Sequence, residues 1–315
     1  MNFTNICVLG GSGFVGSHLV SLLAARTLTT ASSRIVVPVR RRQRAKHLLV
    51  LPSVEVVEAD IHDPATLKAL FTGMDAVINL VGILHQRKPG DFQRAHVELP
   101  RKILAACAAA GVPRLLHMSA LGATANSQSR YQQSKAAGEA LVREARGIQA
   151  TVFRPSVIFG PGDSFLSLFA DLLQLAPVVP LAGAAARFQP VYVGDVASAF
   201  ADALACQETF GQSYDLCGPK VYSLAELLQL TARTLGLKRV VLPLGKTASW
   251  WFARLMELKP GQKLMTRDNH YAMLTDNICP AGCAAQPTTL ESVIGYLKED
   301  GSRRRYMAFR TGAGR

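Results

Sequence analysis

Short runs of apolar, mostly β-branched residues alternate with longer helical patterns along the first half of the chain. A fully apolar run predicts a strand buried on both faces, and apolar residues three and four positions apart predict a helix. The expected strands cover 6–9, 34–39, 54–60, 75–82, 114–120 and 150–159, and the expected helices cover 14–26, 44–50, 64–71, 97–111 and 134–145. This alternation is typical of an α/β fold with a doubly wound parallel sheet.

The second half of the chain loses this regular alternation. Segments 190–204 and 212–218 have the apolar content expected of segments that return to the sheet. The apolar stretch 164–186 is interrupted by Asp171 and Pro177 and fits a buried helix followed by a turn better than a membrane span. The expected organisation is a Rossmann domain over 1–160 with 189–218 returning to it, a smaller substrate lobe over 161–188 and 219–300, and a basic tail over 301–315.

Charge and cysteine content narrow the classes of partner. The net charge is +13, and the first acidic residue is Glu55, so the first 54 residues carry only positive charge. This excess favours anionic partners such as phosphorylated cofactors or anionic membrane surfaces. We expect no nucleic-acid binding, because the basic residues near position 40 lack interleaved aromatic residues. The six cysteines show no paired framework and no metal-ligand spacing, which indicates reduced thiols in the cytoplasm and no metal site.

The first expected strand ends in the glycine-rich sequence GGSGFVG. Glycines at this point let the backbone turn tightly and approach a pyrophosphate, which the N-terminus of the following helix then stabilises. The pattern alone also fits a simple tight turn, but its place between a strand and a helix favours dinucleotide binding. The expected cofactor-binding residues of this loop are Gly10, Ser12, Gly13, Phe14, Val15 and Gly16.

The second expected strand runs directly into the basic sequence VVPVRRRQRAK. In this fold, the end of that strand lies beside the adenosine ribose, where an acidic residue selects NAD and an arginine accommodates the 2′-phosphate of NADP. Because no carboxylate precedes Glu55, we expect NADP(H), bound by Arg40 with help from Arg41. The remaining cations of this run fit a solvated surface.

Further cofactor contacts are expected from the ends of three later strands. Asp60 and Ile61 follow the third strand at the adenine end, although Asp60 could equally cap the next helix. The sequence INLVG, which includes Asn79, is expected to line the nicotinamide side. The remaining cofactor-binding candidates are Leu80, Val81, Gly82, Pro155 and Val157.

Tyr131 and Lys135 lie four residues apart at the start of an expected helix, which places both side chains on one face. A tyrosine is a poor acid or base at neutral pH, and a fixed ammonium beside it lowers its pKa by favouring the phenolate. This spacing is common in amphipathic helices. Its position after a glycine-rich turn and five strand-helix repeats makes a catalytic pair the better interpretation.

At this point the sequence resembles the extended or atypical branch of the short-chain dehydrogenase/reductase superfamily, through GGSGFVG, VINLVG, YQQSK, RPSVIFGPGD and PVYVGDVA. More closely, SALGATANSQSRYQQSKAAGE, YDLCGP and RDNHYAMLTDN look like the group that contains the nucleotide-binding accessory subunit of respiratory complex I and its bacterial relatives. The resemblance implies an NADP(H)-binding Rossmann fold in which Tyr131 is the general acid/base and Lys135 orients the nicotinamide ribose. A Ser or Thr that ends the fifth strand polarises the substrate oxygen in active members.

The chain departs from the family pattern at that last position. Extended enzymes usually carry a pair of hydroxyl residues there, whereas Ser119 is followed by Ala120. Two hypotheses therefore stay open. The first is an oxidoreductase or epimerase-like enzyme acting on a small apolar carbonyl or alcohol, or on a quinone-related substrate, with Ser119, Tyr131 and Lys135 as catalytic residues. The second is a non-catalytic NADP(H)-binding structural or assembly protein of a respiratory or quinone-biosynthesis complex.

The segment 246–259 holds both tryptophans interleaved with cations. It fits an amphipathic helix docked on the smaller lobe, a cover over an apolar pocket, or a helix at a membrane interface. With the basic tail, it makes peripheral association with an anionic membrane or a respiratory complex a further expectation. The expected location is cytoplasmic, with a peripheral position at the inner face of a membrane.

Overall fold

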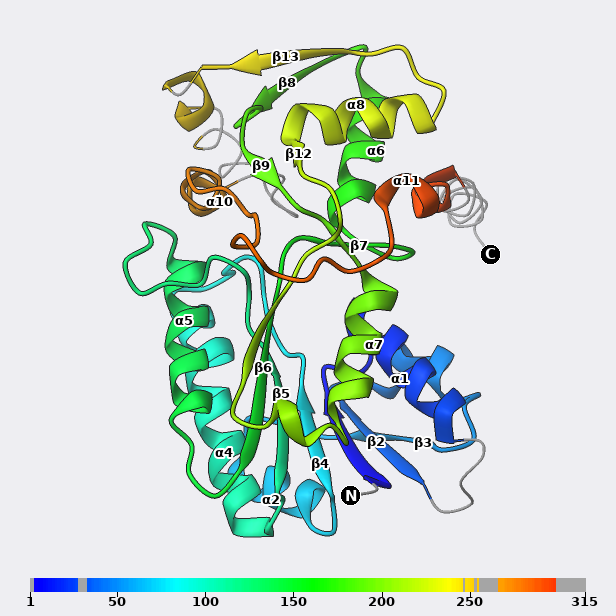
Figure 1. The fold of residues 1–315 in the computed structure, drawn as a ribbon, viewed down its shortest axis with the longest axis vertical. Coiled ribbons are helices and arrows are strands. Elements are labelled where there is room, and N and C mark those ends of the chain that lie inside the picture. Colours follow the sequence, from blue (N-terminus) through cyan, green and yellow to red (C-terminus); the bar gives the residue numbers. More distant parts are fainter. Residues whose placement is uncertain (1–2, 28–32, 246, 252–253, 255–265, 299–315) are drawn as a thin grey trace. The chain divides into compact units, whose positions relative to one another are not determined.

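The computed structural model describes residues 3–27, 33–245, 247–251, 254 and 266–298 (Figure 1). Packing divides the chain into two units, one with Met1–Pro155 and Val193–Asp215 and the other with Ser156–Tyr192 and Leu216–Arg315. The basic tail expected over 301–315 lies outside the described residues. So does much of the tryptophan segment, at 246, 252–253 and 255–259. In the part that is described, no helix is long and apolar enough to cross a membrane.

The first unit is built on a seven-stranded sheet in the order β11-β6-β5-β4-β1-β2-β3. From β3 to β6 all neighbouring strands pair in parallel, and the order reverses between β1 and β4, as in a doubly wound fold. The strands are β1 (Asn5–Leu9), β2 (Arg34–Val39), β3 (Val54–Glu58), β4 (Ala76–Asn79), β5 (Arg114–Met118), β6 (Gln149–Pro155) and β11 (Ser213–Leu216). The α/β fold class predicted from the hydrophobic pattern is confirmed.

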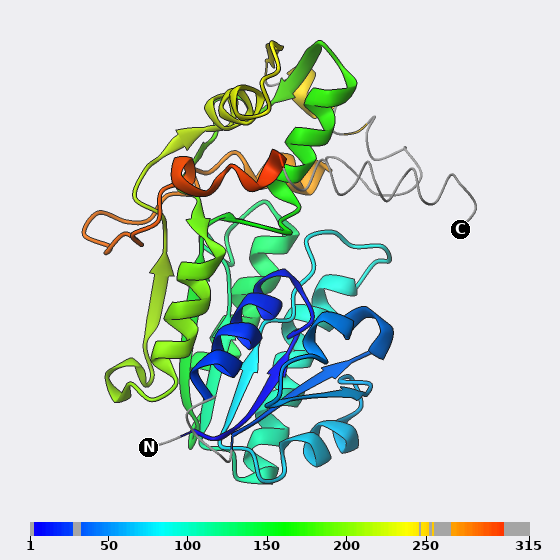
Figure 2. The same cartoon turned by 90° about the vertical axis from the view of Figure 1, so that its right-hand side faces the viewer.

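Helices cover both faces of this sheet (Figures 1 and 2). One face carries α2 (Pro64–Phe71), α4 (Leu99–Ala110) and α5 (Arg130–Arg143), and the other carries α1 (Phe14–Thr27) and α7 (Val193–Ala203). Shorter turns are η1 (Arg42–Leu48), α3 (Asp91–Gln93), the π-helical turn η2 (Arg94–Glu98) and η3 (Gln207–Thr209). Because both faces are covered, the central strands are almost entirely apolar and buried.

The second unit has its own hydrophobic core around α6 (Phe165–Leu175) and α8 (Leu224–Thr234). Among its other described helical segments are α10 (Arg267–Ala272) and α11 (Leu290–Val293). Its short strands are β7 (Ile158–Phe159), β8 (Val178–Ala182), β9 (Arg187–Phe188), β10 (Val191–Tyr192), β12 (Tyr222–Ser223) and β13 (Val240–Leu244). The stretch 164–186 contains the expected buried helix, α6, followed by strand β8.

Two expectations about the backbone are wrong. The segment 44–50 is not an α-helix, because the link between β2 and β3 is the 3₁₀ turn η1, kinked at Ala45. The segment 190–204 does not return to the main sheet as a strand. Only Val191–Tyr192 is extended and pairs with β7, and the apolar residues that follow repeat at helical spacing and form α7.

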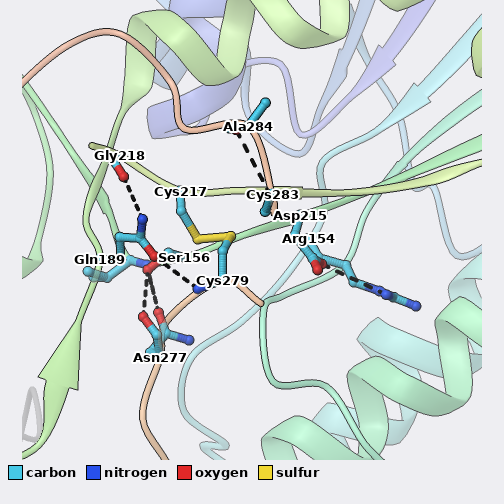
Figure 3. Close-up of a disulfide and its surroundings, with 11 residues drawn as sticks. Arg154, Ser156, Gln189, Asp215, Cys217, Gly218, Asn277, Cys279, Cys283 and Ala284 are labelled. Atoms are coloured by element: carbon cyan, nitrogen blue, oxygen red, sulfur yellow. Dashed lines mark hydrogen bonds and ion pairs between the residues drawn. A yellow bond between two sulfur atoms is a disulfide. The ribbon is translucent and has the colours of Figure 1, made fainter. Parts of the chain in front are cut away.

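The expectation of uniformly reduced thiols is also wrong. Cys217 and Cys279 form a disulfide in the second unit (Figure 3). The Gln189 side chain joins the two segments, since its Oε1 accepts from the Cys279 N–H at 3.0 Å and its Nε2 donates to the carbonyl of Gly218, next to Cys217, at 2.8 Å. The two cysteines are 62 residues apart, so their contact arises from tertiary packing that spacing in the sequence does not reveal.

Candidate functional site

The glycine-rich turn between β1 and α1 brings the backbone into very close approach. A Cβ atom on Gly16 would lie 2.2 Å from the Gly10 carbonyl oxygen, and Gly10 itself has φ of 79°, which favours glycine. The turn leads into the first residues of α1, Phe14 and Val15, whose N–H groups have no acceptor within the helix. This arrangement presents free N–H donors and the positive end of the helix dipole to an anion.

The end of β4 lies against this turn. A Cβ on Gly10 would be 3.1 Å from the carbonyl carbon of Leu80. The buried Asn79 side chain fixes the next residues, since its Oδ1 accepts from the Val81 N–H at 3.1 Å and its Nδ2 donates to His117 Nδ1 at 3.1 Å. Burial and the charge on Lys135 hold the pKa of His117 well below its usual range, so this histidine is neutral. The backbone beyond β4 is therefore rigidly held beside the glycine-rich turn.

Helix α5 carries Tyr131 and Lys135 in consecutive turns. Ser129 starts the helix by accepting from the Gln132 N–H, which is the preferred role of serine at an N-cap. The Lys135 side chain is only 4% exposed and donates from Nζ to the Met118 carbonyl at 2.6 Å. Burial lowers the pKa of Lys135 to about 8, and the Glu139 carboxylate one turn later partly opposes that shift. The ammonium is thus fixed at the end of β5.

Glu139 is held in turn by Arg154 of β6. The Arg154 guanidinium donates from Nε to Glu139 Oε1 at 2.8 Å and forms a second contact to the same oxygen. Glu139 is also almost fully buried. The Arg154 guanidinium therefore neutralises the Glu139 carboxylate, which lies one turn after the buried Lys135 on the same helix.

His96 connects three parts of the site through both ring nitrogens. Its Nε2 accepts from the Ile83 N–H at 3.1 Å, which leaves the ring proton on Nδ1 to reach the Ser134 hydroxyl at 2.8 Å. The Ser134 hydroxyl then donates to the Tyr131 carbonyl. Burial and the Lys135 charge lower the pKa of His96 to about 3, so the neutral ring acts as a fixed hydrogen-bonding bridge.

The Tyr131 ring contacts two aromatic rings of the turn before α4. Its centroid lies 5.9 Å from that of Phe92 and 5.6 Å from that of His96, both in edge-to-face orientation. Across this site, a Cβ on Gly82 would be 3.8 Å from Lys135 Nζ and 3.7 Å from His96 Nε2. The absence of a side chain at Gly82 keeps the space beside the ammonium open.

Ser119 follows immediately after the residue that binds Lys135. Its backbone N–H donates to the Phe153 carbonyl, whereas its hydroxyl is buried and has no hydrogen-bond partner. A buried hydroxyl without a partner is costly in a folded protein and is typical of a site that awaits a ligand.

The structure brings most, but not all, of the sequence candidates together. Arg40 and Arg41 are exposed directly after β2. Asp60 accepts from the His62 N–H, while α2 is capped by Asp63, so the alternative helix-cap role of Asp60 is wrong. For three further candidates the structure gives these contacts: Ile61 packs against the sheet core, Pro155 ends β6 and accepts from the Leu121 N–H, and the Val157 N–H donates to Asn277 Oδ1 within the second unit.

Sequence reasoning missed His96, Ser134 and the Arg154–Glu139 pair. Their functional contacts join residues 13 to 38 positions apart, and no local pattern reports them. The structure adds one signal of its own, the π-helical turn at Arg94–Glu98, since such turns often occur at functional sites.

These features fit a dinucleotide cofactor. The close approach of Gly16 to Gly10 leaves no room for a side chain, and this tight packing of helix against turn is what a dinucleotide-binding glycine loop requires. Hydrogen-bond donors at the carboxyl end of β5, on the same edge of the sheet as the glycine-rich turn, are the unpartnered Ser119 hydroxyl and the buried Lys135 ammonium. Gly10 directly follows β1, Ser119 directly follows β5, and the Lys135 ammonium is bonded to the last residue of β5; ligands of open α/β sheets bind at these carboxyl ends.

Comparisons with known proteins agree with this geometry. The chain is 30% identical over 302 residues to a mouse protein named mitochondrial NADH dehydrogenase [ubiquinone] 1 alpha subcomplex subunit 9, covering 90% of this chain and 77% of the relative. It is 35% identical over 194 residues to a ceramide reductase of Caulobacter vibrioides, covering 61% of this chain and 58% of the relative.

A solved nucleoside-diphosphate-sugar epimerase from Staphylococcus aureus shares the fold, with a TM-score of 0.71, 18% identity, and coverage of 93% of this chain and 99% of the other. The sequence model of the NAD dependent epimerase/dehydratase family matches residues 6–217. The chain therefore belongs to the NAD dependent epimerase/dehydratase family.

Proposed function

We propose that the chain is an NADP(H)-dependent oxidoreductase that reduces a small apolar carbonyl or a quinone-related substrate. The observation that carries this proposal is the buried Lys135 ammonium, held at Met118 beside the unpartnered Ser119 hydroxyl and one helical turn from Tyr131. Burial of an ammonium has a large desolvation cost, and titratable groups perturbed in this way are frequent at functional sites. The names of two relatives, a ceramide reductase and a ketoreductase of Stigmatella aurantiaca, support reduction.

Each residue has a distinct role in the proposed reaction. When bound, NADPH supplies the hydride that is added to the carbonyl carbon. Tyr131 donates its hydroxyl proton to the carbonyl oxygen, and the Lys135 ammonium stabilises the phenolate that remains. Ser119 donates a hydrogen bond to the same oxygen while negative charge develops on it. The Tyr131 phenolate then regains a proton from solvent, and the alcohol leaves.

The wild-type chain is expected to oxidise NADPH with at least one member of a panel of apolar ketones and quinones. Ser119→Ala should lower kcat about 10²-fold with little change in the Kd for NADPH, because one donor to the developing oxyanion is lost. Ser292→Ala, which removes a hydroxyl that bonds to Thr289 in the second unit, is the matched control and should leave kcat unchanged. Equal kcat values for Ser119→Ala and the wild type would contradict the role of Ser119.

A second function is favoured by Ala120 and by relatives named as subunits of NADH dehydrogenase or of NADH-ubiquinone oxidoreductase. In this alternative the cofactor stabilises a structural or assembly protein of a respiratory or quinone-biosynthesis complex. NADPH binding that raises the melting temperature, without oxidation by any member of the panel, would support this alternative over the enzyme.

The preference for NADP(H) is proposed to come from Arg40, which is exposed at the end of β2. Arg40→Glu should raise the Kd for NADPH about 100-fold and the Kd for NADH less than about threefold, because a charge-assisted contact to the 2′-phosphate is replaced by repulsion. Lys46→Glu makes the same charge change at an exposed position on η1 and serves as the control. Isothermal titration with both cofactors measures the effect, and equal weakening of the two would contradict the proposal.

A further inference from the structure

The two-stranded parallel sheet of β8 and β13 has one face on the core of the second unit and one face that is exposed. On the inner face, Val179 and Leu181 are buried and Val241 packs against the same core. Alternate residues point the other way, as in any strand. The register pairs Val178 with Val240 and Pro180 with Leu242, so these four residues share the outer face.

That outer face is apolar throughout. Val178, Val240 and Leu242 are 46%, 61% and 52% exposed, and Pro180 is exposed between them. Leu175, at the end of the helix that leads into β8, is 82% exposed. The outer face of an ordinary surface sheet carries polar residues, so a contiguous apolar face of this kind indicates an interaction surface.

Positive charge borders this face. Arg239 directly precedes β13 and donates from Nε to the Leu173 carbonyl at 2.6 Å, which holds its stem beside the end of α6. Two further cations in the sequence before β13 are exposed: Arg233 in the last turn of α8 and Lys238 in the link from α8 to β13. From 227 to 256 the sequence has no aspartate or glutamate. Glu226 lies in the first turn of α8, and Asp171 lies on α6 one turn before Leu175.

Two tryptophans, Trp250 and Trp251, follow β13 in the sequence. Residues 247–251 are helical, Trp251 is 60% exposed, and the Arg254 guanidinium lies 5.7 Å from the centre of the Trp250 ring. Exposed tryptophan and arginine are favoured at the interface between lipid headgroups and acyl chains.

We propose that the outer face of β8 and β13 is a docking surface for an anionic lipid bilayer. The aliphatic side chains enter the outer edge of the acyl region, and Arg233, Lys238 and Arg239 contact anionic headgroups. A second copy of the chain fits less well, because self-association through this face would bring the same cations together. The inference does not depend on the proposed catalytic activity.

Cosedimentation of the full chain with phosphatidylcholine vesicles, with and without phosphatidylglycerol, tests this proposal. Binding to the anionic vesicles should be at least about tenfold tighter and should weaken as salt is raised. The double variant Val240→Asp with Leu242→Asp should reduce that binding at least about tenfold. Val50→Asp, at an apolar residue that is 78% exposed in the other unit, is the matched control and should bind like the wild type.

Lys238→Glu is a second variant at an exposed position, so it tests the surface even where the double aspartate variant fails to fold. It should weaken binding to anionic vesicles about fivefold and leave binding to neutral vesicles unchanged. The proposal is overturned when neither vesicle binds the wild type, or when the double variant and the control bind equally. A wild-type dimer in light scattering that Lys238→Glu strengthens or Val240→Asp abolishes would assign the face to a second copy instead.

Discussion

Lys135→Met is expected to make the protein more stable and less active at the same time. The pKa of Lys135 falls from its usual 10.5 to about 8 on folding, which corresponds to about 3 kcal/mol of unfavourable burial of the charged form at neutral pH. Part of this is offset, because the variant leaves the Met118 carbonyl without its donor. We expect a net gain of about 2 kcal/mol in the free energy of unfolding and a loss of about 10³-fold in kcat.

The same substitution should change how stability depends on pH. Between pH 8 and 10.5 the unfolded chain retains the Lys135 proton while the folded chain loses it, so the wild-type free energy of unfolding rises with pH in this window. The slope approaches about 1.4 kcal/mol per pH unit and should be absent in Lys135→Met. Denaturant titrations across this window provide the measurement. Lys68→Met, at an exposed lysine of α2, is the control, and an unchanged slope in Lys135→Met would refute the assignment.

Gly138→Ala is expected to cause the second large effect, this time on folding. A Cβ at Gly138 would lie 1.8 Å from the carbonyl oxygen of His96, which belongs to the backbone of the π-helical turn. Since backbone rather than a flexible side chain must move, we expect a loss of about 3 kcal/mol or more in the free energy of unfolding. The displaced turn would also release the hydrogen bond between His96 and Ile83 and weaken NADPH binding.

Gly295→Ala is the matched control for this prediction. A Cβ at Gly295 meets nothing within 4 Å, and the residue does not have positive φ. Its free energy of unfolding should stay within about 0.5 kcal/mol of the wild type. Equal melting temperatures for Gly138→Ala and Gly295→Ala would show that α5 and the turn before α4 are not packed as closely as the structure indicates.

The strands of the first unit were predictable because their signal is local. Five of the six residues of the run RIVVPV are apolar and buried, because the strand is covered on both faces, and β2 covers Arg34–Val39 as expected. The glycine-rich turn and the spacing of Tyr131 and Lys135 are local patterns too. In both cases the residues that form the feature lie within a few positions of one another, so periodicity and spacing report them directly.

Long-range contacts explain what the sequence did not reveal. Arg114 is the first residue of β5, and its guanidinium is fully buried and donates to the carbonyls of Gln149, Ala203 and Leu204. The Cys217–Cys279 disulfide and the bridge through His96 have the same character. Each depends on segments that meet only after the chain has folded, and single-sequence patterns contain no information about such partners.

The central claim is that Tyr131 is the proton donor in an NADPH-dependent reduction. Phenylalanine at this position retains the ring that packs against Phe92 and His96 and removes only the hydroxyl. The most direct test compares kcat of Tyr131→Phe and the wild type on the best carbonyl substrate of the panel, with the Kd for NADPH measured on the same samples. We predict a kcat about 10³-fold lower with a Kd within about twofold of the wild type. Wild-type kcat in Tyr131→Phe would contradict the account.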